Sequence, residues 1–362
     1  MQKNEFDTKL KELIAERARE ERESAKERSP KIGKILLQDR LFLEQLQDSA
    51  EEIFARKIVV PKFSTKKAKS IKRQQNLLLS DLHLHAMLDG LEVPLKYGPV
   101  EEARALSNIV IQAADYKTQY RDDTLLNVSV CGDIIQGSLH DPRDGAPLAQ
   151  QSAAAMHLLT QAIGFLAANY PKVIVRCTPG NHGRNQARHK ERAIHQKWDS
   201  IENIIYYGTK IALAHVPNVT VEIPYTPYIT YDSFGAKVFG THGDTVINPG
   251  NPGKSINIES LRKQINEWNG RLAASERYQL FFVGHVHTAA TVVLPNGVRF
   301  ISNGCLVPPD SYSVASGYNT TCGQWIWESV PGHVVGDMRF IVVDEKTYTD
   351  SSLNVIKPFE KF

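Results

Sequence analysis

The sequence carries Asp, Asn and His residues in five short groups, each shortly after an apolar run. The groups are Asp81-Leu82-His83, Gly132-Asp133, Asn181-His182, Thr241-His242 and His285-Val286-His287. Each apolar run has the length and composition of a buried strand. In open α/β sheets, ligands bind beyond the carboxyl ends of the strands. We therefore expect the five groups to meet in one place.

Carboxylate, amide and imidazole groups together form a mixed oxygen and nitrogen ligand set, which suits Mn²⁺, Fe or Zn²⁺. The groups hold eight such side chains, and even seven ligands are too many for one open catalytic ion, but they suit two ions that share a bridging carboxylate. Two ions held about 3.5–4 Å apart can clamp a phosphoryl group and lower the pKa of a bound water. The residue types alone therefore predict phosphoester hydrolysis at a dinuclear centre.

Short apolar runs alternate with helical segments from residue 75 onward, which is the pattern of an α/β fold. We expect strands at 76–80, 127–131, 172–177, 236–240, 279–283, 290–294, 298–302 and 339–343. We expect helices at 100–116, 148–168, 260–277 and over part of 186–214. These elements would position the five polar groups at strand ends.

The N-terminal part of the chain has a different composition. Residues 1–55 hold two helical patterns with many Glu, Lys and Arg and a thin apolar stripe, which predicts a charged helical appendage. Residues 56–74 predict a basic linker, because the stretch from Arg56 to Arg73 holds eight basic residues and no acidic one. The remaining 75–362 would form the α/β domain.

Charge is distributed unevenly along the 362 residues, whose net charge is +3. Residues 1–75 carry 19 Lys and Arg against 13 Asp and Glu, so the rest of the chain is slightly acidic. The basic run could bind nucleic acid by releasing counterions, or it could be an exposed tether. The five Lys and Arg residues between Arg184 and Lys197 could likewise form a basic edge beside the site, or an ordinary solvated helix face.

Several protein classes are excluded by composition. No apolar run approaches 18 residues and the first thirty residues are charged, so we expect neither a membrane-spanning helix nor a secretory signal. The four cysteines contain no C-x-x-C pair, which argues against a zinc finger or a disulfide framework. We expect reduced, buried thiols and a cytoplasmic protein.

Together with their neighbouring glycines, the five groups become Asp-x-His, Gly-Asp, Gly-Asn-His, Gly-x-His and Gly-His-x-His. In this order they resemble the signature blocks of the calcineurin-like metallophosphoesterases, over about residues 75–345. The resemblance implies a metallophosphoesterase four-layer sandwich, an α/β fold in which two mixed β-sheets are flanked by helices. In this chain the sandwich would carry the N-terminal helical appendage.

The resemblance also implies a role for each residue and two divalent metal ions, with Mn²⁺ as first choice and Fe, Zn²⁺ or Mg²⁺ as alternatives. The first metal would be held by Asp81, His83 and His287. Asp133 would bridge, and the second metal would be held by Asn181, His242 and His285. His182 would be the catalytic acid that serves the leaving oxygen.

One position departs from the family pattern. Members commonly carry Asp directly after the Asn-His pair, where it can orient the His, whereas this chain has Gly183-Arg184. Arg184 is therefore a candidate substrate-binding residue for a phosphate. Asp244 is either a partner for an imidazole or a loop-capping residue.

The Gly-Asn-His-Gly-Arg variant and the basic N-terminus are similar to phosphoesterases of tailed phages and prophages, which are grouped with DNA-repair exonucleases. We therefore expect a metal-dependent DNA exo- or endonuclease that works in the cytoplasm. If a phage encodes it, this is the cytoplasm of the bacterial host. We expect nucleic acid as its partner and no association with a membrane. A homodimer is a candidate assembly. The alternatives are a phosphatase for nucleotides or phosphoproteins, and a non-catalytic virion or scaffold protein on the same fold.

Overall fold

The computed structural model describes residues 71–359, except for 92, 94, 140–143, 185–196, 198, 225, 251–254 and 319–320. The predicted appendage at 1–55 and most of the predicted linker at 56–74 lie outside the described residues. The first described strand begins at Arg73. Among the described residues, no helix is both long and apolar enough to cross a membrane.

Six strands form the first sheet, in the order β11-β10-β1-β2-β3-β4. They are β1 (Arg73–Leu79), β2 (Thr124–Cys131), β3 (Lys172–Thr178), β4 (Val219–Glu222), β10 (Gly323–Val330) and β11 (His333–Val342). Strands β1 to β4 are parallel, and β10 and β11 add antiparallel to the β1 edge. The continuous apolar run Leu77–Leu79 is fully buried, as expected for a parallel strand covered on both faces.

Five strands form the second sheet, in the order β5-β6-β7-β9-β8. They are β5 (Tyr228–Ser233), β6 (Ala236–Thr241), β7 (Tyr278–Val283), β8 (Ala290–Val293) and β9 (Arg299–Ser302). The three central strands are parallel to one another, and the edge strands β5 and β8 are antiparallel to their neighbours. Both sheets are therefore mixed.

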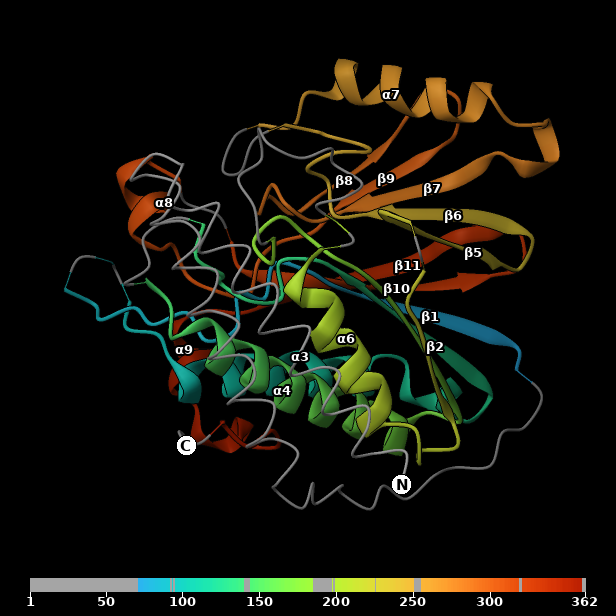
Figure 1. Cartoon of the computed structure of the whole chain (residues 1–362). Helices are drawn as coiled ribbons and strands as arrows, with labels where there is room; N and C mark the ends of the chain where they lie inside the picture. Colours follow the sequence, from blue (N-terminus) through green and yellow to red (C-terminus); the bar gives the residue numbers. More distant parts are fainter. Residues whose placement is uncertain are drawn as a thin grey trace, which may run out of the picture. The chain divides into compact units, whose positions relative to one another are not determined.

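The two sheets pack face to face through one apolar core. Phe282 of the second sheet lies in this core with Leu78 and Trp327 of the first. The preceding residue, Phe281, points to the opposite face because strand side chains alternate, and it packs with Leu261 of α7 (Ile258–Gly270). Helix α7 thus covers the outer face of the second sheet (Figure 1).

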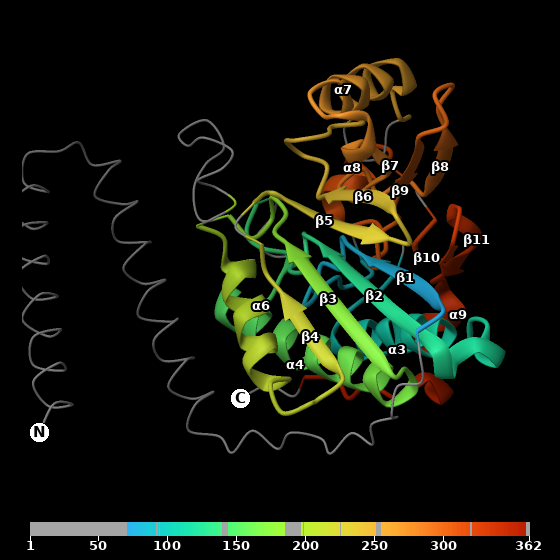
Figure 2. The same cartoon turned by 90° about the vertical axis from the view of Figure 1, so that its right-hand side faces the viewer.

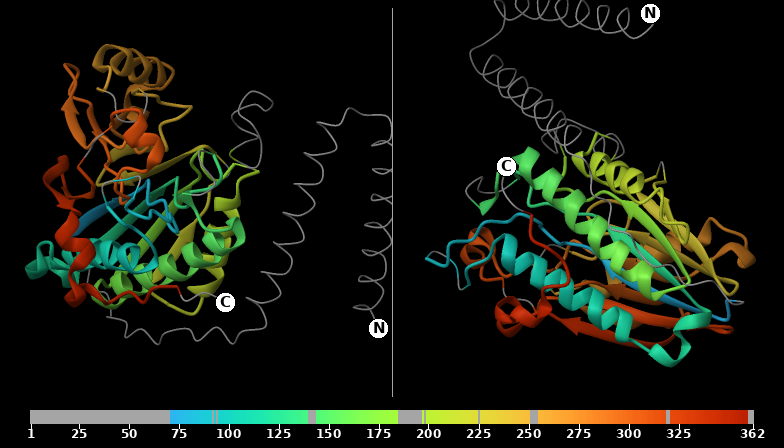
Figure 3. Two further views of the ribbon diagram at one scale, coloured as in Figure 1. Left: turned by 90° about the vertical axis from the view of Figure 1, so that its left-hand side faces the viewer. Right: turned by 90° about the horizontal axis from the view of Figure 1, so that it is seen from below.

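Three helices cover the outer face of the first sheet: α3 (Pro99–Asp115), α4 (Leu148–Asn169) and α6 (Ile201–Ala212). Figure 2 shows them behind strands β1 to β4, and the right panel of Figure 3 shows α4 between the other two. The remaining elements are short: α8 (Ser311–Ala315), α9 (Glu345–Thr349), η1 (Thr118–Asp123), η3 (Ala274–Glu276) and η4 (Ser351–Leu353). The layer order of helices, sheet, sheet and helix confirms the expected fold class.

All eight expected strands are present. Three further strands, β4, β5 and β10, were missed. Of these, β4 has only four residues, while β5 carries polar residues on its exposed side. One helix is shorter than expected, because the helix predicted at 260–277 ends at Gly270. The helix predicted over part of 186–214 is present as α6, which begins after the N-cap Ser200, whose hydroxyl accepts from the Glu202 amide.

Candidate metal centre

The five predicted groups follow the carboxyl ends of β1, β2, β3, β6 and β7, and the structure brings their loops into contact. The Asp81 amide donates to the Gly132 carbonyl over 3.0 Å, and the His83 amide donates to the Asp133 carbonyl over 3.0 Å. The His285 amide donates to the Asp81 carboxylate over 2.9 Å, although the two residues are 204 positions apart in the sequence. Distant parts of the chain therefore share one site, as the strand-end argument predicted.

Metal-competent side chains form three groups whose ligand atoms lie within 4.8 Å of one another. The groups are Asp81, His83 and His287; His83, Asp133 and His182; and Asp133, His242 and His285. Two of them contain Asp133, so its carboxylate lies between the two predicted metal positions. The geometry agrees with the predicted division of ligands, while the ligand roles themselves stay a prediction.

The first predicted metal position is outlined by two ring nitrogens that face each other. His83 Nε2 lies 3.2 Å from His287 Nε2, and His287 Nε2 lies 3.3 Å from Asp81 Oδ1. Two imidazole nitrogens at this separation need a proton or a cation between them, because two bare lone pairs repel. This donor set, with one carboxylate, fits a divalent ion of the Mn²⁺, Fe or Zn²⁺ class.

The second predicted position is built around His242. Its Nε2 atom lies 3.0 Å from Asp133 Oδ2 and 3.0 Å from Asn181 Oδ1. Its Nδ1 atom lies 2.8 Å from the Cys131 carbonyl and donates to it, so Nε2 faces the cluster. A backbone carbonyl that fixes the tautomer in this way is the usual arrangement behind a metal-binding His. His285 lies beside it, with ring centroids 5.1 Å apart.

Backbone strain is concentrated in the same loops. Left-handed backbone is adopted by Asp81 (φ 53°), His83 (45°), Asp133 (51°), His285 (67°) and His287 (56°). Each such non-glycine residue costs on the order of 1–3 kcal/mol and persists only where its surroundings hold it, as at functional sites. Five of the seven predicted ligands share this feature, which is independent of their side-chain chemistry.

The signature glycines allow these loops to approach closely. A Cβ atom at Gly180 would lie 2.0 Å from Asp133 Oδ1, and one at Gly284 would lie 2.4 Å from Asp81 Oδ2. A Cβ atom at Gly132 would lie 2.3 Å from the Gly180 amide nitrogen. Any side chain at these positions would push a predicted ligand out of place.

The charges of the cluster depend on one another. Burial lowers the pKa of His242, but the Asp133 carboxylate outweighs burial and raises that pKa to about 10. Burial and the neighbouring His242 charge lower the pKa of His285 to about 4. The pKa of Asp133 lies well below its usual value because the attraction of His242 and His182 exceeds the effect of burial. Without metal, His242 therefore carries a proton where a cation would otherwise sit.

His182 is oriented without the carboxylate that the family pattern supplies. Its Nδ1 atom donates to the Gln136 carbonyl over 2.6 Å, and its amide donates to Asp133 Oδ1 over 2.8 Å. The Gln136 carbonyl fixes the proton on Nδ1, and Nε2 lies 3.9 Å from Asp133 Oδ2, on the cluster side of the ring. Sequence reasoning missed Gln136 because a backbone carbonyl leaves no residue-type signal.

Glu202, at the start of α6, is a second residue that sequence reasoning missed. Its buried carboxylate accepts the Ile134 amide and the Gly180 amide, both over 2.6 Å. Ile134 follows Asp133 and Gly180 precedes Asn181, so one carboxylate clamps the loops that carry two predicted ligands. Burial and the Asp133 charge raise the pKa of Glu202 to about 7.

A comparable clamp holds the loop after β1. Glu102 of α3 is fully buried and accepts the His85 amide over 2.5 Å and His85 Nδ1 over 2.9 Å. His85 lies two residues after His83 and also has left-handed backbone, with φ 63°. The pair therefore anchors the loop that carries the first predicted ligands to helix α3.

The predicted basic edge is only partly described, because residues 185–196 lie outside the described residues. At one end, Arg184 is half-buried and pairs with Ser200 through an isolated β-bridge, which places it beside the start of α6. At the other end, Lys197 is buried, and its Nζ donates to Asp244 over 2.7 Å and to the Pro179 carbonyl over 2.9 Å. Assigning Lys197 to an exposed edge was therefore wrong, and Asp244 forms a buried ion pair.

No protein-family model and no curated protein matches the chain. Among solved structures, it is similar to a predicted phosphoesterase from Streptococcus pneumoniae, with 11% identity over 76% of this chain and 100% of the other, and a TM-score of 0.32. It is also similar to a dimetal phosphatase from Danio rerio, with 12% identity over 74% and 96% of the two chains and a TM-score of 0.37. A phosphatase from Mycoplasma pneumoniae has 14% identity over 79% and 100%, with a TM-score of 0.30. These likenesses are too distant to assign an activity to this chain.

Proposed function

We propose that this protein is a metal-dependent phosphoester hydrolase with a dinuclear centre. The observation that carries the proposal is the place of Asp133, whose carboxylate belongs both to the cluster with His83 and to the cluster with His242 and His285. A shared carboxylate between two oxygen and nitrogen ligand sets would hold two ions close together, which suits two-metal hydrolysis. The strained backbone of Asp133 supports the same conclusion.

Two divalent ions held here would polarise a phosphoryl oxygen and lower the pKa of a bound water. The protein's own side chains would then orient the substrate and manage its protons. With the Nδ1 proton held by the Gln136 carbonyl, the doubly protonated ring of His182 would deliver its second proton from Nε2, which is the atom on the cluster side. We assign His182 the role of the acid at the leaving oxygen. Arg184, two residues further along, would contact a phosphate.

For the substrate, we propose the phosphodiester bonds of nucleic acid, cleaved by a DNA exo- or endonuclease of phage or prophage type. The sequence supports this choice through the basic run from Arg56 to Arg73, which contains eight Lys and Arg residues and no Asp or Glu. Each Lys or Arg that neutralises a phosphate releases a counterion, so DNA cleavage should depend strongly on salt. The proposed setting is the cytoplasm, with nucleic acid as partner.

The test is hydrolysis with Mn²⁺ of end-labelled single- and double-stranded DNA, beside bis-p-nitrophenyl phosphate and p-nitrophenyl phosphate. We expect cleavage of DNA and of the small diester, both lost in Asp133→Ala. Turnover of the monoester alone would replace the nuclease with a small-substrate phosphatase. Bound Mn²⁺ without turnover of any of these esters would contradict the hydrolase and favour a scaffold protein on this fold.

The contribution of the basic run can be tested separately in the full-length chain. Replacing Lys66, Lys67 and Lys69 by Gln should make the salt dependence of DNA cleavage shallower, by about 0.7–0.9 in slope for each phosphate that is no longer neutralised. Hydrolysis of the small diester should not change. The matched control is Lys172→Gln, which removes one exposed charge at the start of β3. An unchanged slope in the triple variant would show that the basic run does not hold the DNA.

A further inference from the structure

Two thiols lie side by side behind the site. Cys305 follows β9 and Cys322 precedes β10, and their Sγ atoms are 3.6 Å apart. Both side chains are buried. Their backbones are already joined, because the Gly323 amide donates to the Cys305 carbonyl over 2.7 Å. Closing the gap to the disulfide length of about 2.05 Å therefore needs small side-chain rotations rather than a refolded loop.

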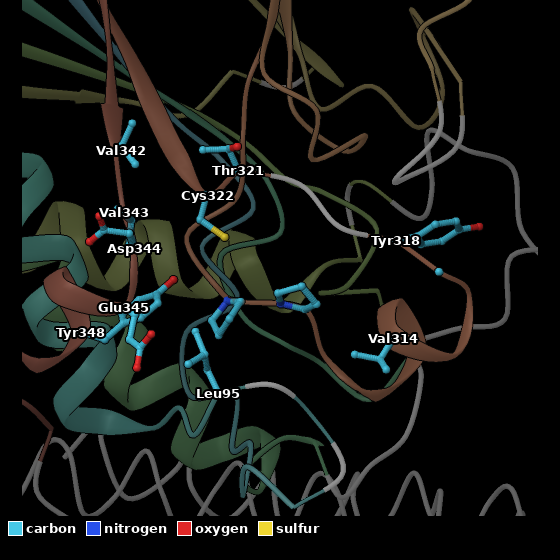
Figure 4. A pocket seen from close by; sticks show the side chains of 13 residues that line it. Leu95, Val314, Tyr318, Thr321, Cys322, Val342, Val343, Asp344, Glu345 and Tyr348 are labelled. Carbon is cyan, nitrogen blue, oxygen red and sulfur yellow. The ribbon is translucent and has the colours of Figure 1, made fainter.

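Solvent can reach one of the two thiols through a pocket. Cys322 lines a cavity of about 530 Å³ together with Pro308, Thr321 and Tyr348. Figure 4 shows the Cys322 sulfur at this pocket, between the segment at Val343 and the turn at Val314. A small oxidant can enter such a space, whereas Cys305 is not among the residues that line it. The pair thus has one accessible thiol and one resolving thiol.

The other two cysteines cannot pair in this way. Cys131 and Cys177 lie on neighbouring strands, but Cys177 is in register with Val130. Residues in register point to the same face of the sheet, so Cys131 points to the opposite face. Cys131 indeed lies in the core between the sheets. Of the four thiols, only Cys305 and Cys322 are placed to form a bond.

We propose that Cys305 and Cys322 form a reversible disulfide by exchange with a low-molecular-weight disulfide such as oxidised glutathione. The Cys322 thiolate attacks one sulfur of the oxidant, which breaks its S–S bond and releases one thiol. The Cys305 thiolate then attacks the mixed disulfide and releases the second thiol. The two protein thiols are oxidised, the small disulfide is reduced, and the two protons end on the released thiols.

Formation of this disulfide should change the metal affinity of the proposed site. Both Sγ atoms lie near the Val307 carbonyl and donate to it, from Cys305 over 3.3 Å and from Cys322 over 3.2 Å, and oxidation removes both donors. Leu306, which directly follows Cys305, contacts the site itself, because its amide donates to the Asp81 carbonyl over 2.9 Å. The disulfide would also close residues 306–321 into a covalent loop beside Asp81. This coupling rests on the proposed metal-binding function, whereas the disulfide does not.

The experiment starts with the reduced full-length protein, incubated with oxidised glutathione and freed of it by gel filtration. Before any alkylation we expect the intact mass to be lower by two hydrogen atoms and dithiothreitol to restore the starting mass. After alkylation of the remaining free thiols, peptide mapping should join Cys305 to Cys322. Glutathione left on Cys322, another cysteine pair, or four free thiols would each overturn the proposal.

Serine variants provide matched controls, because a hydroxyl can still donate to the Val307 carbonyl. Cys305→Ser and Cys322→Ser should not lose the two hydrogens, whereas Cys177→Ser should do so like the wild type. Mn²⁺ affinity is then compared before and after oxidation. We expect a change on the order of tenfold in the wild type and in Cys177→Ser, and none in Cys305→Ser. Equal affinities in all cases would overturn the coupling. Failure of the reduced protein to bind Mn²⁺ would instead count against the proposed function.

Discussion

The Cγ atom of Glu202 lies 2.6 Å from the point that a Cβ atom at Gly183 would occupy. Residue 183 is the position where the family pattern commonly has Asp. Here a carboxylate reaches the same region from helix α6, and it clamps the loops of Asp133 and Asn181 through the Ile134 and Gly180 amides. A side chain at position 183 would therefore clash with Glu202.

Substitution of Gly183 tests this relationship. Gly183→Ala should place its methyl group against Glu202 Cγ and against Ser200 Oγ, which lies 2.8 Å from the point that the added carbon would occupy. Such overpacking costs about 1–3 kcal/mol of stability, measured as the free energy of unfolding in urea. Gly270→Ala is the control, because nothing lies within 4 Å of a Cβ atom there.

A double-mutant cycle separates this clash from other effects. In a Glu202→Ala background the Glu202 Cγ atom is gone and only the contact with Ser200 Oγ remains, so Gly183→Ala should cost less than in the wild type. Equal costs in the two backgrounds would show that Gly183 is required for some other reason.

Glu202→Gln should weaken metal binding. A carboxylate accepts both amides, whereas a glutamine amide offers one acceptor oxygen and presents a donor to the other amide. Loss of one clamp should lower Mn²⁺ affinity by about 10- to 100-fold, measured by titration calorimetry. Glu259→Gln removes an exposed carboxylate from α7 and should leave the affinity unchanged. Wild-type affinity in Glu202→Gln would mean that the clamp does not position the ligands.

His182→Ala should separate catalysis from metal binding. The variant should keep both metals while its rate on esters with poor leaving groups falls by about 10²- to 10⁴-fold, the usual contribution of a positioned acid. Esters with good leaving groups, such as p-nitrophenyl phosphodiesters, should be affected less. His333→Ala, on the exposed start of β11, is the control. Loss of metal in His182→Ala would make this residue a ligand, a role that its cluster with His83 and Asp133 also permits.

Metal binding should release protons. The Asp133 carboxylate raises the pKa of His242 to about 10 in the metal-free protein, so at neutral pH the ring is protonated and must lose that proton to bind a cation. Mn²⁺ affinity should therefore rise as the pH is raised through the neutral range. His285, with a pKa lowered to about 4, is already neutral in this range. Calorimetry in two buffers with different ionisation enthalpies measures the release, and identical enthalpies would contradict it.

The sequence predicted the strands of the site and the loops that follow them, because buried parallel strands leave apolar runs and the proposed ligands are Asp and His residues at fixed spacing. It could not predict the residues that hold those loops. Glu202 lies in the first turn of a helix, where acidic residues are common for reasons of capping and dipole alone. Gln136 acts through its backbone carbonyl, which every residue type has. The sequence around Lys197 is that of a solvated charge, because it does not show that Asp244 lies beside it in the fold.

The central claim is that Asp133 joins two metal positions, and the metal content of Asp133→Ala tests it most directly. After incubation with Mn²⁺ and gel filtration, elemental analysis should find two ions per wild-type chain and two in Asp337→Ala, which removes an exposed carboxylate from β11. We predict at most one ion in Asp133→Ala, together with loss of diester hydrolysis. Two retained ions in Asp133→Ala would contradict the bridging role, and with it the dinuclear centre as described.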